Sequence, residues 1–223
     1  MNVILFGATG MVGQGVLREC LLDTRVQQVL SIVRTPSNQQ HPKLRELIHT
    51  DFFNYSAIES QLIGFNACFF CLGVSSAGMD EAKYTRLTHD LTLAAASTLA
   101  RFNPQMTFIY VSGAGTDSTE RGRIMWARVK GRTENDILKL PFRAAYIFRP
   151  GFIQPLHGIR SKTKLYQFFY DVLNPIFPLV KAAFPGHITT TEEVGRAMLN
   201  VAQNGFPKPV LEVTDIVHAA SVT

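Results

Sequence analysis

The residues best placed to do chemistry stand at the start of the chain, in the stretch NVILFGATGMVGQG. Gly7, Gly10 and Gly13 are spaced three apart, after an apolar run and before apolar residues at helical spacing. A turn from a buried strand into a helix needs glycine where the backbone reverses, where a ligand approaches and where helix and strand pack closely. Free backbone N–H groups at the helix start then suit a pyrophosphate. The pattern predicts a dinucleotide-binding turn, with contacts from Gly7, Thr9, Gly10, Met11, Val12 and Gly13.

The end of the second predicted strand bears on which dinucleotide is bound. The apolar run from Val29 to Val33 is followed directly by Arg34. At this place an acid would accept the 2′-hydroxyl of NAD, whereas an arginine pairs with the 2′-phosphate of NADP. Arg34 therefore predicts a preference for NADP(H), with NAD(H) as the alternative. The simpler interpretation is that Arg34 is a solvated residue after a strand.

Further cofactor contacts are expected where later strands end. Leu44 to Thr50 predicts a short helical turn or a third strand, and Asp51 then either accepts from an adenine amino group or caps the turn before a helix at Tyr55 to Ile63. Ala67 to Leu72 predicts a fourth strand, and the loop from Gly73 to Gly78 should pass over the cofactor, because ligands bind outside the carboxyl ends of strands in open α/β sheets. The additional contact residues are Asp51, Phe52, Leu72, Gly73, Pro150 and Gly151.

The rest of the chain alternates between helices and strands. A long helix, stopped by Asn103-Pro104, is expected to carry one buried face. The predicted strand Thr107 to Val111 is followed by a helix at Arg121 to Leu140 and a strand at Ala144 to Phe148. The expected buried face of the long helix consists of Tyr84, Leu87, Leu91, Ala95, Thr98 and Phe102.

The last part of the chain begins with TTTEE, in which Thr189 and Glu192, or Thr190 and Glu193, have capping-box spacing. The helix that follows should end before Asn204-Gly205, and a last strand is predicted from Val210 to Val213, with a short helix or tail after it. Regular alternation implies right-handed crossovers and a parallel sheet covered on both faces. We expect one domain over residues 1–223, a doubly wound three-layer α/β Rossmann fold.

Composition excludes several classes of protein. The 22 basic and 17 acidic residues leave a net charge of only +5, without a Lys/Arg-rich run or an aromatic RNA-binding signature, so no nucleic-acid partner is expected. No uninterrupted apolar run is long enough to span a membrane. The first apolar residues are needed as a strand rather than as a leader, which predicts a cytoplasmic location.

Cys68 and Cys71 form a CxxC spacing inside ACFFCLG, which is typical of a buried strand. Residues three apart on a strand point to opposite faces, and there is no second CxxC or nearby His pair. We therefore predict neither a metal site nor a redox pair.

Five stretches, in order along nearly the whole chain, resemble the atypical short-chain dehydrogenase/reductase superfamily, in particular its NAD-dependent epimerase/dehydratase-like branch. These are GATGMVG at 7–13, YVSGAG at 110–115, WARVKG at 126–131, FRPGFI at 148–153 and VGRAMLN at 194–200. The resemblance implies a Rossmann fold that binds NADP(H) and an oxidoreductase activity on a small molecule.

The same resemblance assigns site residues. It places the substrate-polarising serine at Ser112, the ribose-binding lysine at Lys130 and the proton-donating tyrosine at Trp126. An indole N–H donates a hydrogen bond but does not ionise near neutral pH, so the usual acid is missing. Cofactor binding should survive this substitution better than catalysis does. His157, Tyr84, Asp117 or a water relayed through Ser112 are the alternative proton donors.

The segment 154–188 departs from the regular alternation, because it begins basic and becomes apolar and aromatic. Three interpretations compete: helices packed at the sheet edge, a lid over an apolar substrate, or a surface for a partner. We expect an oxidoreductase for a small, largely apolar carbonyl compound, as a monomer or homodimer. The alternative is an NADP(H)-binding regulator or redox sensor that acts through a protein partner.

Overall fold

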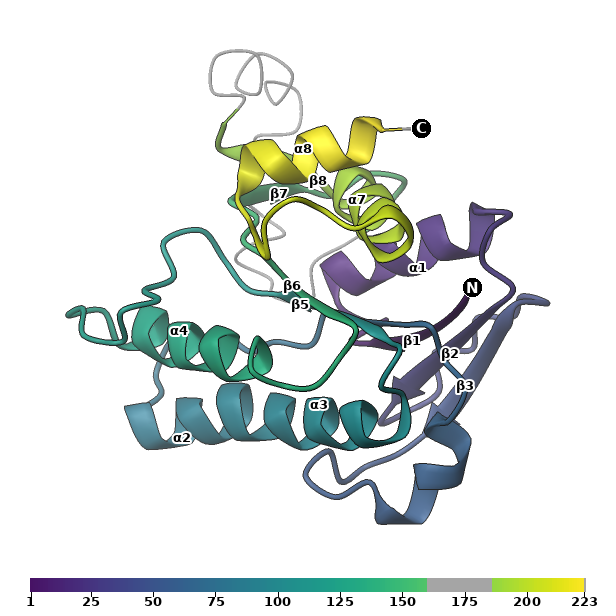
Figure 1. Ribbon diagram of the computed structural model, residues 1–223, viewed down its shortest axis with the longest axis horizontal. Coiled ribbons are helices and arrows are strands. Elements are labelled where there is room, and N and C mark those ends of the chain that lie inside the picture. Colours follow the sequence, from purple (N-terminus) through teal and green to yellow (C-terminus); the bar gives the residue numbers. More distant parts are fainter. Residues whose placement is uncertain (160–185, 223) are drawn as a thin grey trace.

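The computed structural model describes residues 1–159 and 186–222. Its main sheet has seven parallel strands in the order β3-β2-β1-β4-β5-β6-β9 (Figure 1). The strands are β1 (Asn2–Phe6), β2 (Gln28–Val33), β3 (Leu44–Ile48), β4 (Ala67–Phe70), β5 (Thr107–Val111), β6 (Ala144–Phe148) and β9 (Val210–Leu211). The strand order reverses between β1 and β4, which is the switch point where ligands bind in such sheets. The predicted doubly wound Rossmann fold is confirmed.

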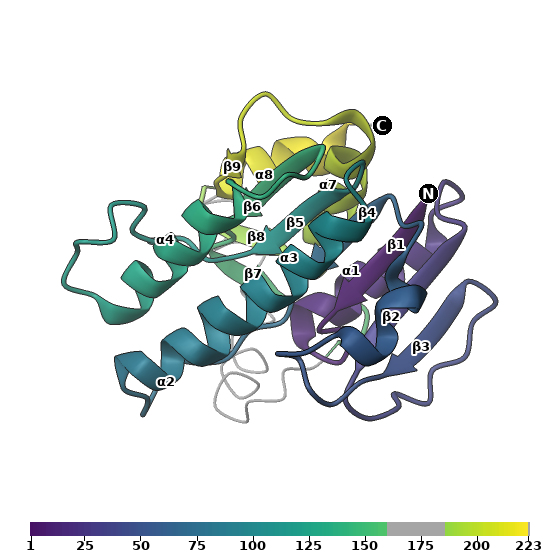
Figure 2. The same ribbon diagram turned by 60° about the horizontal axis from the view of Figure 1, so that its bottom comes forward.

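Helices cover both faces of this sheet (Figures 1 and 2). One face carries α1 (Met11–Leu22), α7 (Thr191–Asn204) and α8 (Val213–Ser221). The other carries α2 (Glu81–Thr85), a single π-helical turn (Arg86–Asp90), α3 (Leu91–Phe102) and α4 (Met125–Ile137). A 3₁₀ segment, Ser56–Leu62, stands where the sequence predicted a helix from Tyr55 to Ile63.

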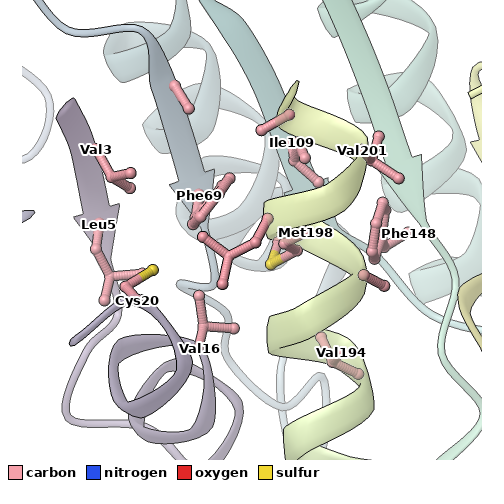
Figure 3. Close-up of a cluster of buried hydrophobic side chains, with 14 of the residues drawn as sticks. Val3, Leu5, Val16, Cys20, Phe69, Ile109, Phe148, Val194, Met198 and Val201 are labelled. Atoms are coloured by element: carbon pink, nitrogen blue, oxygen red, sulfur yellow. The ribbon is translucent and has the colours of Figure 1, made fainter. Parts of the chain in front are cut away.

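The core divides into two layers because strands buried on both sides send alternate side chains to opposite faces. On the α1/α7 side, Leu5, Phe69 and Ile109 meet Val16 of α1 and Met198 of α7 (Figure 3). On the other side, the layer is richer in aromatic rings. It contains Phe6, Phe52, Tyr55, Phe65, Phe70, Phe108 and Tyr110.

The α1–α7 contact depends on small residues. A Cβ added at Gly15 would lie 2.6 Å from the Cβ of Thr191, and one added at Gly195 would lie 2.6 Å from Cγ of Glu19. The two helices therefore approach more closely than larger side chains would allow. The start of α7 follows the second of the two capping boxes predicted, with Thr190 as N-cap and Glu193 as its reciprocal partner.

The long helix is confirmed, and its buried face was predicted in part, because Tyr84, Leu91 and Ala95 are buried as expected. The buried residues are Tyr84, Thr88, Leu91, Thr92, Ala95, Ala96, Leu99 and Ala100. The π-helical turn adds a residue to one turn, so side chains after it are displaced from an uninterrupted 3.6-residue period. As a result Leu87, Thr98 and Phe102 are only half-buried.

Other differences concern boundaries. Leu44–Ile48 is a strand, which settles the alternative of a helical turn. The helix predicted from Arg121 begins only at Met125, because a loop held by Asp117 precedes it. A second sheet of two parallel strands, β7 (Phe152–Gln154) and β8 (Ile188–Thr190), was not predicted, since strands of three residues carry too little pattern. In the described ranges, no helix combines the length and apolar character needed to cross a membrane.

Candidate functional site

The glycine turn after β1 is as narrow as its sequence predicts. Gly7 has φ +81°, in the left-handed region that favours glycine. A Cβ added at Gly13 would lie 2.0 Å from the carbonyl oxygen of Gly7, and one added at Gly7 would lie 2.7 Å from the carbonyl carbon of Cys71. Helix α1 and the segment after β4 therefore both pack closely against Gly7. Neither Gly7 nor Gly13 has room for a side chain.

The start of α1 presents its backbone N–H groups without a competing cap. Gly10 is the N-cap, and among the described residues no side-chain hydrogen bond to the first turn of the helix is seen; that turn contains no acid. A Cβ added at Gly10 would meet, of the described atoms, only the carbonyl oxygen of Gly7, at 3.3 Å. The helix terminus can accept an anion by its N–H groups and its dipole.

Arg34 follows β2 directly and is exposed. No hydrogen bond or ion pair engages its guanidinium within the described residues. The nearby acid Glu46 is occupied elsewhere, because its carboxylate accepts from the N–H and the hydroxyl of Ser37. Arg34 is thus available to an anionic group, and its exposure fits the alternative of a solvated residue after a strand equally well.

Asp51 and Phe52 are more structural than expected. One carboxylate oxygen of Asp51 accepts from the N–H of Phe53 at 3.0 Å, so the turn-capping alternative is present. The ring of Phe52 is 5% exposed and packs edge-on against Phe6, with 6.0 Å between ring centroids. Any contact of Phe52 with a ligand would therefore use its backbone.

The segment after β4 lies beside the glycine turn. A Cβ on Gly7 would lie 2.8 Å from the backbone nitrogen of Leu72, which places Leu72 at the turn. Gly73 is exposed and has no described atom within 4 Å of the position of an added Cβ. The structure therefore brings Leu72, and Gly73 after it, next to the predicted anion site.

Ser112 stands just after β5 and is buried. Its hydroxyl oxygen is 3.1 Å from that of Thr116, and the Thr116 hydroxyl donates to the carbonyl oxygen of Gly113 at 2.8 Å. A hydroxyl has only one hydrogen, so Ser112 donates to Thr116 whenever Thr116 donates to Gly113. In this arrangement the Ser112 oxygen keeps its lone pairs for a ligand.

Trp126 and Lys130 lie one turn apart on α4 and both reach the end of β5. The outer edge of the Trp126 ring is 3.7 Å from the position of a Cβ added on Gly115. The Lys130 ammonium lies 5.3 Å from the ring centroid of Tyr110, two residues before Ser112. Lys130 therefore lies over the last part of β5, near Ser112 in the sequence, and Trp126 lies beside the loop that follows that strand.

Lys130 is half-buried, and within the described residues its ammonium has no hydrogen-bond acceptor. Burial lowers the pKa of Lys130 to about 8, and the negative charge of Glu134 opposes that shift. A hydroxyl-bearing ligand would supply the acceptors that the ammonium lacks, which matches the ribose-binding role implied by the resemblance.

Pro150 and Gly151 line the same region. The N–H of Ala114 donates to the carbonyl oxygen of Pro150 at 3.0 Å, so the turn after β6 is tied to the loop after β5. A Cβ added at Gly151 would lie 2.4 Å from the carbonyl oxygen of His187, which leaves no room for a larger residue.

Asp117 holds a loop rather than standing free as an acid. Its carboxylate accepts from the hydroxyl of Thr119 at 2.6 Å and from the N–H groups of Gly122 and Arg121 at 2.6 and 3.1 Å. The Thr119 hydroxyl and then the Gly122 N–H keep the pKa of this carboxyl below its usual value. A proton donor at neutral pH needs the opposite shift.

The other two alternative donors are also engaged. Tyr84 is 2% exposed, and burial raises the pKa of its phenol. The His157 ring is exposed and lies 2.7 Å from the carboxylate of Glu192 on α7. His157 thereby lowers the pKa of Glu192, and the pair links the loop after β7 to the start of α7.

Sequence reasoning missed a buried charged cluster beside Lys130. Glu134, 1% exposed along its side chain, accepts from Arg149, which also donates to Glu212 and Ser118. Glu134 lies one helical turn after Lys130, and that spacing was the available signal. No short-range pattern relates Glu134 to Arg149, which comes from a different element.

Cys68 and Cys71 point to opposite faces of the sheet, as predicted. Cys68 joins the aromatic core layer, whereas Cys71 packs against the opposite layer, so the two side chains face apart. Burial raises the pKa of both thiols, and both are free. Of the segment 154–188 that was expected to form a lid or partner surface, residues 160–185 lie outside the described residues.

Solved structures with similar folds and related sequences were both found for this chain. No protein-family model matches the chain. A short-chain dehydrogenase family protein from Francisella tularensis has TM-score 0.64 and 16% identity, with 95% of each chain covered. The enzyme WbmF from Bordetella bronchiseptica, crystallised with NAD⁺, has TM-score 0.65 and 15% identity over 97% of this chain and 76% of that one. These similarities confirm the fold of the short-chain dehydrogenase/reductase superfamily.

Sequence relatives are fungal proteins. Protein fmp52, mitochondrial, from Emericella nidulans is 29% identical over 210 residues, 89% of this chain and 86% of that protein. Protein FMP52, mitochondrial, from Saccharomyces cerevisiae is 30% identical over 171 residues, 74% of this chain and 69% of that protein.

Those names contradict the cytoplasmic location expected from the sequence. That expectation rested on the need for the first apolar residues as a strand, and a strand requirement says nothing about the compartment in which the fold works. With 30% identity over more than two thirds of the yeast protein, the chain belongs to the FMP52 protein family.

Proposed function

We propose that the chain binds NADP(H), in preference to NAD(H), across the carboxyl edge of its sheet, and that it acts as an oxidoreductase on a small, largely apolar carbonyl compound. The observation that carries this proposal is the uncapped start of α1 above the Gly7–Gly13 turn, at the switch point between β1 and β4. A pyrophosphate needs open backbone N–H groups, and this turn supplies them.

Two cations support binding on either side of that turn. Arg34, exposed and unpaired within the described residues, is placed to fork around a 2′-phosphate. Lys130, half-buried and lacking an acceptor there, is placed to donate to ribose hydroxyls. A bound NADPH would supply a hydride to the substrate.

An apolar substrate is supported by exposed side chains on segments that follow strand ends. Val74 after β4 and Ile124 before α4 are 41% and 56% exposed. The roles of the polar groups are narrower: the Ser112 oxygen, whose hydrogen goes to Thr116, can accept from a ligand hydroxyl or a water, and Trp126 closes the space beside Gly115.

The second candidate is a regulator that holds NADP(H) without turnover and acts through a protein partner. Trp126 favours it, because an indole cannot transfer a proton to a developing alkoxide. The other proton donors that we considered are tied down: Asp117 organises a loop, Tyr84 is buried and His157 pairs with Glu192. A water held by Ser112 is the route left to the enzyme.

Calorimetric titration with NADPH and NADH tests the cofactor proposal. Charged hydrogen bonds are worth about 1.5–3 kcal/mol each, so NADPH should bind at least about tenfold more tightly than NADH, and Arg34→Ala should remove the difference. Arg45→Ala is the matched control, because Arg45 is an exposed arginine on the neighbouring strand that bonds to Gln61. Equal affinity for the two cofactors, or a preference that persists in Arg34→Ala, would refute the assignment.

A further inference from the structure

Lys130 stands in surroundings that do not by themselves favour a charged amine. It is half-buried, and its ammonium lies over the Tyr110 ring on β5, which is also close to the Tyr84 phenol on α2. Burial keeps both phenols neutral, because it raises the pKa of each. A charged group facing Lys130 within the described residues comes from its own helix, at Glu134.

Glu134 is held firmly in that place. Side chains four apart on a helix lie on the same face, so Glu134 and Lys130 are neighbours along α4. The Glu134 side chain is 1% exposed. Arg149 clamps it, with Nε at 3.1 and 3.2 Å from the two carboxylate oxygens and a further donation from Nη2.

Arg149 also contacts a second carboxylate, through the guanidinium nitrogen that does not bind Glu134. Its Nη1 donates to the Glu212 carboxylate at 3.1 Å, at the N-cap of α8. Lys130, Glu134, Arg149 and Glu212 therefore form a chain of alternating charges with no net charge. Glu212 is 47% exposed along its side chain, so solvent screens that end, whereas the Glu134 end is dry.

A role in stability alone explains this cluster poorly. Taking two charges out of water costs several kcal/mol per ion, and the attraction between them often does no more than offset that cost, so apolar side chains would serve about as well. Negative charge next to a half-buried ammonium has a specific consequence: it favours the charged form of the amine.

We propose that Glu134 is a positioning residue that keeps the Lys130 ammonium charged and oriented toward the ligand, and that Arg149 holds Glu134 in place for this purpose. The inference rests on the proposed function, since it gives Lys130 its ligand. It adds a residue that acts through Lys130 without touching the cofactor.

The experiment compares Glu134→Gln, the double variant Glu134→Gln/Arg149→Met and the control Glu212→Gln. Glutamine keeps an oxygen for Arg149 but removes the charge. The double variant guards against misfolding, because it removes both buried charges and leaves neither unpaired. Glu212→Gln weakens the same clamp at its exposed end, away from Lys130.

The first readout needs neither cofactor nor turnover. Brief labelling with acetic anhydride across a pH series, read by mass spectrometry, gives the pH at which Lys130 becomes a reactive free amine. In the unmodified protein that midpoint should lie at about 8. Loss of the neighbouring negative charge should lower it by about one pH unit in Glu134→Gln and by less in the double variant, which also removes the Arg149 cation, and Glu212→Gln should leave it in place. A folded Glu134→Gln protein with an unchanged midpoint overturns the proposal, and so does a folded double variant whose midpoint rises.

The second readout is the NADPH dissociation constant against pH. A charged Lys130 binds ribose hydroxyls below its pKa, so affinity should fall as pH rises through about 8 in the unmodified protein and through a lower pH in the Glu134 variants. A merely structural Glu134 would weaken binding equally at every pH, which also overturns the proposal. If the unmodified protein binds no NADPH while the labelling midpoints still differ, the proposed function fails and the electrostatic role of Glu134 stands.

Discussion

The two halves of the candidate site are built differently. The nucleotide half, Gly7–Gly13 with Arg34, depends on backbone shape, because Gly7 and Gly13 have no room for a Cβ and the start of α1 offers bare N–H groups. The catalytic half, Ser112 with Trp126 and Lys130, depends on side chains that other side chains hold. At Gly7 and Gly13 the backbone leaves no room for a substitution, whereas a site made of side chains can change its chemistry and keep its fold.

The nucleotide half should fail completely when its tightest glycine is enlarged. A Cβ in Gly13→Ala would lie 2.0 Å from the carbonyl oxygen of Gly7, so α1 must move away from β1. We expect a loss of about 3 kcal/mol in the free energy of unfolding, measured in urea, together with loss of NADPH binding. Gly186→Ala is the control, since the nearest atom to its added Cβ is 3.7 Å away. A Gly13→Ala protein of normal stability would contradict this account of the turn.

Gly10→Val separates ligand approach from folding. Gly10 has φ −84°, which any residue adopts, and the space before it is open apart from the Gly7 carbonyl at 3.3 Å. The variant should therefore fold, as shown by circular dichroism, yet lose measurable NADPH affinity, because the side chain occupies the path of the pyrophosphate. Normal binding by a folded Gly10→Val protein would remove the central claim about the nucleotide half.

These glycines also show why part of the molecule could be predicted. The strand–turn–helix at Gly7–Gly13 and the capping box at Thr190 are local, since spacing within a few residues decides them. The alternating strands gave the order of elements for the same reason. The π-helical turn at Arg86–Asp90 was missed because one extra residue in a helical turn leaves no mark in the pattern of apolar and polar residue types.

For the catalytic half, the sequence suggested the site residues themselves but not the side chains that hold them in place. The resemblance proposed Ser112, Trp126 and Lys130; in the structure Lys130 lies over Tyr110 of β5 and Trp126 beside Gly115, and their roles stay predictions. The clamp of Glu134 by Arg149 joins residues 15 positions apart on different elements, and only the fold makes them neighbours. The loop-holding role of Asp117 was likewise not predicted. Four donors within the next five residues bind its carboxylate, and their hydrogen bonds depend on how the loop folds.

Trp126→Tyr tests whether the catalytic half can change its chemistry. If the protein is a reductase that lacks its acid, a phenol next to Lys130 should raise NADPH oxidation with small apolar aldehydes by about 10²-fold, the scale of general acid catalysis. Trp126→Phe is the matched control, since it opens similar space without an acid. The same rise in both variants would show that space, not a proton, was limiting. No turnover in either variant, with normal NADPH binding, would favour the regulator.

The smallest expected effect separates structural support from the nucleotide half itself. Thr190 caps α7, which packs closely on α1: its hydroxyl accepts from the N–H of Glu193 at 3.0 Å, and the Glu193 carboxylate accepts from the Thr190 N–H at 2.8 Å. Thr190→Ala should lower the free energy of unfolding by about 1 kcal/mol, and Thr190→Ser should restore it. NADPH affinity should stay within about twofold, because the backbone of the Gly7–Gly13 turn contains no part of this cap. A parallel loss of affinity in Thr190→Ala, recovered in Thr190→Ser, would mean that side chains on α7 also hold the anion site open, and the contrast between the two halves would no longer stand.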